Sequence, residues 1–94
     1  MRSTPNYREI FCKRLRASRL ASGLSQKKLG MLAGIDEFAA SARINRYERG
    51  IHEVDVQTAQ HLATVLNVPL AYFYADDDQL AELILAFGRS VSQK

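Results

Sequence analysis

The sequence has few of the residues that cross-link or interrupt a small protein. Among its 94 residues there are one cysteine (Cys12), two prolines and five glycines, and there is no tryptophan. A single cysteine excludes an internal disulfide, and the low proline and glycine content excludes collagenous and low-complexity chains. No stretch approaches the roughly 18 consecutive apolar residues of a membrane helix, and the opening MRSTPNYREI lacks the apolar core of a signal peptide. We therefore expect one soluble, cytoplasmic domain over residues 1–94, without membrane association.

Catalytic and metal-binding patterns are also scarce. The two histidines, His52 and His61, are nine residues apart, and no HExxH or CxxC spacing is present. Cys12 has no histidine near it in the sequence, and no glycine-rich loop is available to hold a phosphate group. We therefore expect neither an enzyme nor a metal site nor a cofactor.

The formal net charge of +3 is distributed unevenly along the chain. Residues 1–50 contain eleven Lys or Arg and four Asp or Glu, a net charge of +7, whereas residues 51–94 contain two basic and six acidic residues, a net charge of −4. A small domain with a basic half suits a polyanionic partner such as nucleic acid. The alternative at this point is a solvated helix face rich in arginine.

Apolar residues recur at the spacing of amphipathic helices, and no five-residue stretch alternates as a β-strand does. Ser25 and Asp55 are good N-cap residues, as is Thr4 or Asn6 near the N-terminus. The sequence therefore predicts an all-α fold of five or six short helices. The expected helices span about residues 7–23, 26–33, a stretch ending near 49, 56–67, 70–74 and 79–88.

Residues 26–49 have the form of a helix-turn-helix. A short helix, a glycine-containing turn and a second helix follow one another, and Gly30 and Gly34 lie where the two helices must approach closely. Leu29, Leu32 and Ala33 are expected to form the buried stripe of the first helix. In such a motif the second helix enters the major groove of DNA.

Three segments that surround this motif occur in a characteristic order: LRASRLASGLSQKKL (15–29), INRYERG (44–50) and LATVLNVPLAYFY (62–74). Together they resemble the lambda-repressor/Cro-like, or XRE-type, helix-turn-helix family, over about residues 11–74. The resemblance implies a compact domain that binds double-stranded DNA and regulates transcription, with repression as the expected outcome. It also implies that the third helix is inserted into the major groove.

The resemblance assigns base contacts to the third helix. It implies that Gln26, at the start of the second helix, contacts the DNA backbone and supports a base-reading side chain. Arginine can donate two hydrogen bonds to guanine, and asparagine can pair with adenine, so the residue types suit this role. For Ser41 and Asn45 the alternative is an ordinary solvated helix face. The candidate base-contact residues are Gln26, Ser41, Ala42, Arg43, Asn45 and Arg46.

Further basic residues are candidates for phosphate contacts, which position a protein on DNA without specifying sequence. For each of them alone, plain solubilising charge is the alternative. The resemblance also implies a structural salt bridge between Arg19 and Glu48, which would set the angle of the third helix. The phosphate-contact candidates are Lys13, Arg16, Lys27, Lys28 and Arg49, with Arg43 as a further member.

The chain departs from the family spacing between Gly34 and Ile44, where it has about four additional residues, 36–39. Four residues are about one helical turn, so either the third helix begins a turn early or the preceding turn is longer. The two acids in this stretch would repel phosphates, which favours a loop that bends them away. Phe38 either packs against the core or extends into the groove against a thymine methyl group.

The last expected helix, 79–88, lies outside the resemblance and is apolar on more than one side. Such a helix needs two partners, its own core and another chain. We therefore expect a homodimer through this helix; the alternative is that its apolar residues complete the core. A protein-interaction module of the same fold, such as an antitoxin whose toxin binds the acidic half, is the second functional hypothesis. The candidate dimer contacts are Leu80, Leu83, Ile84 and Phe87.

Overall fold

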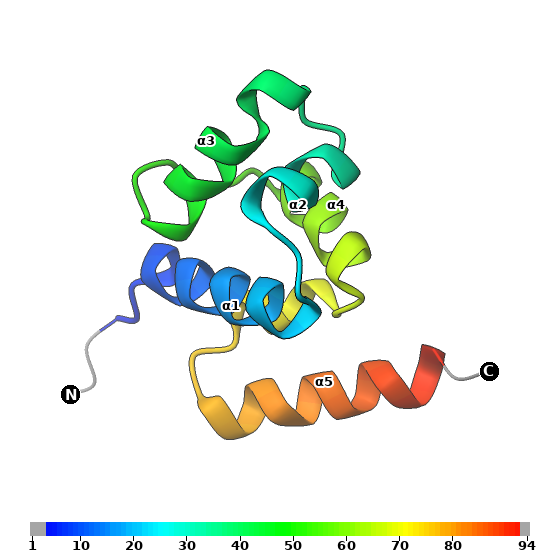
Figure 1. The fold of residues 1–94 in the computed structure, drawn as a ribbon. Coiled ribbons are helices and arrows are strands. Elements are labelled where there is room, and N and C mark those ends of the chain that lie inside the picture. Colours follow the sequence, from blue (N-terminus) through cyan, green and yellow to red (C-terminus); the bar gives the residue numbers. More distant parts are fainter. Residues whose placement is uncertain (1–3, 93–94) are drawn as a thin grey trace.

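The computed structural model describes residues 4–92, and every regular element in this range is helical (Figure 1). The all-α prediction is therefore confirmed. The elements in chain order are α1 (Tyr7–Ser22), α2 (Gln26–Leu32), α3 (Glu37–Glu48), α4 (Val56–Leu66), the 3-10 helix η1 (Leu70–Tyr74) and α5 (Asp78–Ser92).

Local capping interactions explain where the helices begin. The side chain of Asn6 accepts the N–H groups of Arg8 and Glu9 at the start of α1, and Ser25 accepts the N–H of Lys28 at the start of α2. Asp55 does the same for α4 through the N–H of Thr58. These bonds satisfy backbone donors that have no partner inside the helix. Because capping depends on near neighbours in the sequence, these starts agree with the sequence prediction.

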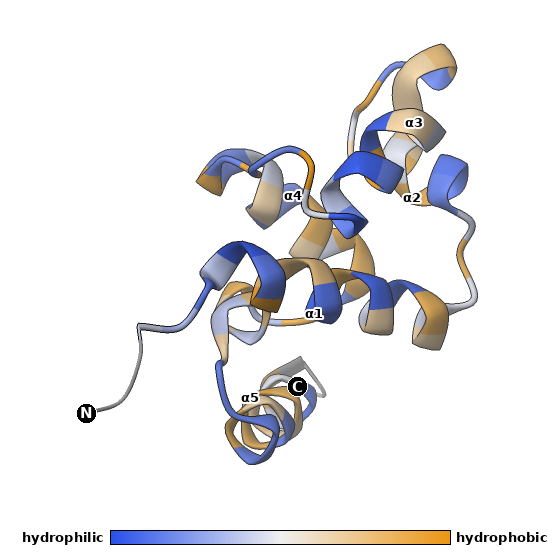
Figure 2. Ribbon diagram, turned by 90° about the vertical axis from the view of Figure 1, so that its left-hand side faces the viewer, coloured by the Kyte–Doolittle hydropathy of each residue, from blue (hydrophilic) through white to orange (hydrophobic). Residues whose placement is uncertain are grey.

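The core lies between α1, the α2–α3 pair, α4 and η1. Fully buried side chains come from each of these elements, and the Phe11 and Phe73 rings lie 4.8 Å apart between centroids. Figures 1 and 2 both show α5 on the opposite side of α1 from α2 and α3. The helix-turn-helix and the last helix therefore occupy separate faces of the molecule. The fully buried large side chains are Leu15, Leu29, Ile44, Leu62 and Phe73.

The second helix buries a different face from the one predicted. Leu29 and Gly30 are buried, whereas Leu32 is 53% exposed, so the assignment of Leu32 to the core is wrong. Gly30 packs against Ala40 of α3, and a residue two positions further lies about 200° around the helix, on nearly the opposite side. Leu32 is turned to solvent for this reason.

The last helix is longer than predicted, since it continues past Gly88 to Ser92. Gly88 does not end the helix; it allows α5 to approach Pro69, because a Cβ at position 88 would lie 2.8 Å from Cγ of that proline. Ala81 is buried, and Ile84 and Leu85 pack half-buried against the core. One side of α5 thus completes the core.

A buried arginine attaches α5 to α1. The guanidinium of Arg14 donates to the carbonyl oxygen of Ala75 from Nε (3.1 Å) and Nη2 (2.9 Å), and to the Asp78 carboxylate from Nη1 (2.9 Å). It also lies over the ring of Tyr72. Lys13 adds a second ion pair to Asp78 at 3.2 Å. The hydrogen bonds from Arg14 and then Lys13 hold the pKa of Asp78 below its ordinary value.

Candidate nucleic-acid interface

The additional residues 36–39 extend the third helix rather than the turn. Asp36 is the N-cap of α3 and accepts the N–H of Phe38 at 3.1 Å, and the helix begins at Glu37. The expectation of a loop that bends the two acids away is therefore wrong. The physical reason is that carboxylates are favourable at a helix N-terminus, where the backbone presents unpaired N–H groups. Glu37 is also within 3.6 Å of Lys27 Nζ on α2.

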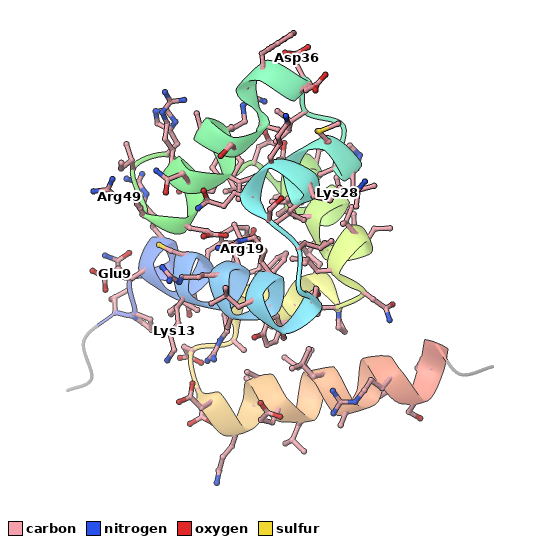
Figure 3. All side chains as sticks on the ribbon, viewed as in Figure 1. Glu9, Lys13, Arg19, Lys28, Asp36 and Arg49 are labelled. Atoms are coloured by element: carbon pink, nitrogen blue, oxygen red, sulfur yellow. The ribbon has the colours of Figure 1, made fainter. Side chains whose placement is uncertain are left out.

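The faces of α3 are set by its buried residues, Ala40, Ile44 and Tyr47. Most of the remaining side chains of α3 are exposed, and they include Arg43 and Arg46; Arg49, the C-cap residue that follows the helix, is exposed as well. Figure 3 shows Asp36 and Arg49 at opposite ends of α3. Of the candidate base-contact residues on this helix, Asn45 is half-buried, and the exposed ones are Ser41, Ala42, Arg43 and Arg46.

Gln26 joins the start of α2 to α3. Its Nε2 atom donates to Asn45 Oδ1 at 3.3 Å and to Glu48 Oε1 at 3.1 Å. Gln26 and Asn45, two of the candidate base-contact residues, are therefore brought into direct contact. Because the amide of Gln26 is held by two acceptors, it restrains the side chain of Asn45 as well.

Arg19 and Glu48 form a bidentate ion pair between α1 and the end of α3. The Arg19 Nε and Nη2 atoms donate to the two carboxylate oxygens, and Nη1 donates to the carbonyl oxygen of Leu24 at 3.0 Å. The two side chains are only 11% and 3% exposed. The hydrogen bond to Glu48 raises the pKa of Arg19 above its ordinary value. With Gln26 on the same carboxylate, α1, α2 and α3 meet at one polar cluster.

The phosphate-contact candidates fall into two groups. Arg16, Lys27, Lys28 and Arg49 are exposed on α1, α2 and the end of α3. Lys13 lies on the side of α1 that faces α5, where it pairs with Asp78 (Figure 3). The first group can share a surface with α3, whereas Lys13 has a structural partner on another face.

Sequence reasoning missed the role of Arg14. Arg14 was not among the candidate residues, yet the residue is 7% exposed and its guanidinium anchors the chain before α5. The spacing contained the signal, because Arg14 lies three residues after Phe11 and next to Leu15, on the buried stripe of α1. An arginine at such a position needs a buried acceptor, which only the fold supplies.

Within residues 4–92 no helix is both long and apolar enough to cross a membrane. In the same range no three His, Cys, Asp or Glu side chains gather where they could hold a metal ion.

Two short helices joined by a tight turn, with the second exposed and arginine-rich, define a helix-turn-helix domain. Residues 15–73 match the helix-turn-helix family model. The chain belongs to the lambda-repressor/Cro-like (XRE-type) helix-turn-helix family of DNA-binding transcriptional regulators. The resemblance in the sequence is thereby confirmed.

Related proteins carry consistent names. The chain is 36% identical over 63 residues to uncharacterised HTH-type transcriptional regulators of Sinorhizobium medicae (strain WSM419) and Rhizobium meliloti (strain 1021). These matches cover 67% of this chain and 42% of each relative, so the chain spans less than half of their length. The crystal structure of the transcriptional regulator BswR is similar, with a TM-score of 0.78 and 55% identity over 82% of this chain and 76% of that one.

Proposed function

We propose that this protein is a sequence-specific repressor of transcription that binds double-stranded DNA as a homodimer, with α3 in the major groove. The observation that carries the proposal is the exposed side of α3, which includes Arg43 and Arg46. The C-terminal end of this helix is held against α1 by the Arg19–Glu48 ion pair. A rigidly held helix with exposed hydrogen-bonding side chains is what base reading requires.

Base reading is assigned to the exposed side of α3. Arg43 and Arg46 can each donate two hydrogen bonds to a guanine, and Asn45 can pair with an adenine. Gln26 donates to Asn45 Oδ1 and so orients this amide before DNA binds. Ser41 and Ala42 lie exposed one turn nearer to the helix N-terminus and complete the set.

Phosphate contacts are assigned to the exposed basic residues around α3. Arg16, Lys27, Lys28 and Arg49 supply positive charge on α1, α2 and the end of α3. Lysine and arginine at such positions displace counterions from DNA, which makes binding sensitive to salt. Lys13 is left out of this set because it lies on the side of α1 that faces α5, away from α3 (Figure 3).

The homodimer is assigned to the outer side of α5. Leu80, Leu83, Phe87 and Val91 are exposed and follow one another at intervals of three and four residues, so they form one stripe. Ile84, which the sequence grouped with them, is half-buried at the edge of this stripe. The proposed dimer contacts are therefore these four exposed residues, with Ile84 at the margin.

A second copy of the chain suits this stripe because its centre carries no charge. At 100° per residue, Asp78, Glu82 and Arg89 lie on nearly the opposite side of α5 from Leu80 and Phe87. Two such stripes can therefore pack together about a two-fold axis without opposing like charges. Since α3 lies across α1 from α5, both recognition helices stay exposed in the pair (Figure 1).

Selection of bound duplexes from random DNA, followed by gel-shift titration against competitor DNA, tests the proposal. We expect one enriched site with two related half-sites, and a preference for it that persists at physiological salt. Binding with equal affinity to enriched and competitor DNA would contradict the proposal and would favour the protein-interaction hypothesis.

A further inference from the structure

Phe38 stands out on the surface of α3. Its side chain is 93% exposed, and no other large apolar side chain is as exposed in the part of the chain that the structure describes. It lies in the first turn of α3, within the additional residues that make this helix one turn longer. Its backbone N–H donates a hydrogen bond to the capping carboxylate of Asp36, which fixes the backbone from which the side chain projects.

The position of Phe38 places it on the proposed base-reading side of α3. It precedes Ala42 by four residues and Asn45 by seven, which is one face of a helix. The buried residues Ala40 and Ile44 lie on the other side. At 1.5 Å per residue, Phe38 extends this face about 6 Å beyond Ala42 toward the helix N-terminus.

The surroundings of Phe38 fit a base edge and not a phosphate. The carboxylates of Asp36 and Glu37 adjoin it, and both would be repelled by the DNA backbone. The Glu37 charge is offset by Lys27 at 3.6 Å, and the Asp36 carboxylate accepts a backbone N–H. An apolar ring in this setting needs an uncharged apolar partner, and in the major groove the only such group is the 5-methyl of thymine.

The start of α3 is also held firmly enough to position the ring. Ala40, two residues after Phe38, packs directly against Gly30 of α2. Lys27, also on α2, forms an ion pair with Glu37 at the start of α3. A contact that reads a base depends on such support from neighbouring elements. The additional turn is therefore an anchored extension of the recognition helix.

We propose that Phe38 is a specificity-determining residue that contacts the 5-methyl group of a thymine, so that the additional turn of α3 lengthens the base-reading surface. The proposal rests on the DNA-binding function proposed above. It adds to that function one contact, between Phe38 and a thymine, that the helix-turn-helix motif alone does not specify.

The test uses the full chain and its selected duplex site, with each thymine replaced in turn by uracil, which lacks only the 5-methyl group. For the wild-type protein we expect one thymine per half-site at which replacement weakens binding about four-fold, the effect of losing one buried methyl group. Phe38→Ala should weaken binding about ten-fold or more and should bind thymine and uracil at that position equally well. Leu20→Ala, which also truncates an exposed apolar side chain but on α1, is the control and should keep the wild-type sensitivity.

The outcomes separate this proposal from the one on which it rests. If Phe38→Ala keeps the affinity, the selected sequence and the uracil sensitivity of the wild type, Phe38 does not read thymine, although DNA binding stands. A protein partner for Phe38 would give that same DNA result and would also overturn the proposal. If the wild type prefers no duplex over competitor DNA, the proposed function itself fails. Thermal unfolding checks that Phe38→Ala is folded, as its exposure leads us to expect.

Discussion

A methyl group on Gly30 would lie 2.7 Å from Cβ of Ala40, so the backbone of α2 at Gly30 packs directly against Ala40 of α3. Carbon atoms in contact are normally about 3.5–4.0 Å apart, so only glycine allows the two helices to lie at this separation. Ala40 belongs to the buried face of the lengthened α3. Gly30 and Ala40 therefore set how closely α2 and α3 pack.

We predict that Gly30→Ala lowers the free energy of unfolding by about 1–3 kcal/mol, the usual effect of overpacking. This sign is opposite to that of an exposed helix site, where alanine stabilises by up to about 1 kcal/mol relative to glycine. Urea unfolding monitored by circular dichroism measures the change. The double variant Gly30→Ala with Ala40→Gly moves the methyl group to the other helix and should recover part of the loss. A stabilised single variant would contradict the packing argument.

Breaking the ion pair between α1 and α3 should be strongly destabilising. Glu48→Gln leaves the buried guanidinium of Arg19 without its counter-charge, and we expect a loss of about 3–5 kcal/mol in the free energy of unfolding. The measurement is thermal and urea unfolding of both proteins. The exposed pair of Arg8 and Glu53, at 3.7 Å, provides a control, because Glu53→Gln should cost less than about 1 kcal/mol. An unchanged melting temperature for Glu48→Gln would refute the structural role.

Two substitutions should separate base reading from phosphate contact. Arg46→Ala should weaken binding to the selected duplex by about 1–3 kcal/mol and relax the preference for one base pair. Lys28→Ala should weaken binding to all duplexes alike and reduce the salt slope by about 0.9. Fluorescence anisotropy across a salt series, with the selected duplex and a scrambled one, gives both quantities. If the two variants lose affinity in the same sequence-independent way, Arg46 does not read a base.

Polar substitution of the α5 stripe should produce a monomer. The variant Leu83→Gln with Phe87→Gln changes two exposed side chains, so the fold is expected to persist while self-association is lost. Size-exclusion chromatography with light scattering reports the mass, and circular dichroism reports the fold. Glu82→Gln, on another side of the same helix, should remain dimeric. A wild-type protein that is monomeric at high micromolar concentration would contradict the dimer.

Acid should remove the stabilisation contributed by Asp78. Its pKa is lowered in the folded state by Arg14 and Lys13, so this contribution is complete above the unfolded pKa of about 3.9 and is lost as pH falls through the lower folded value. Asp78→Asn should therefore destabilise the protein at pH 7, and its deficit should shrink as the pH falls below about 4. Urea unfolding at several pH values measures the deficit. Asp76→Asn controls for the loss of one negative charge from the same segment, and an equal deficit for both variants at pH 7 would contradict the argument.

Much of the site could be predicted because its signals are local or belong to a family. The order of the family segments located the helix-turn-helix, and the roles carried over by resemblance named Arg19, Glu48, Gln26 and Asn45. The structure places these four residues in one hydrogen-bonded cluster. The start of α3 was left open, because four additional residues fit both a longer helix and a longer turn.

The sequence by itself determined where helices begin and which helices are amphipathic, since caps and apolar periodicity depend on residues within one or two turns. Only the tertiary structure decided which side of each helix finds a partner. Gly88 is a point of contact with Pro69 and not a helix end, and Arg14 is buried because Ala75 and Asp78 lie against it. Leu32 and Phe38 are exposed for the same reason, because burial is settled by elements that are distant in the chain.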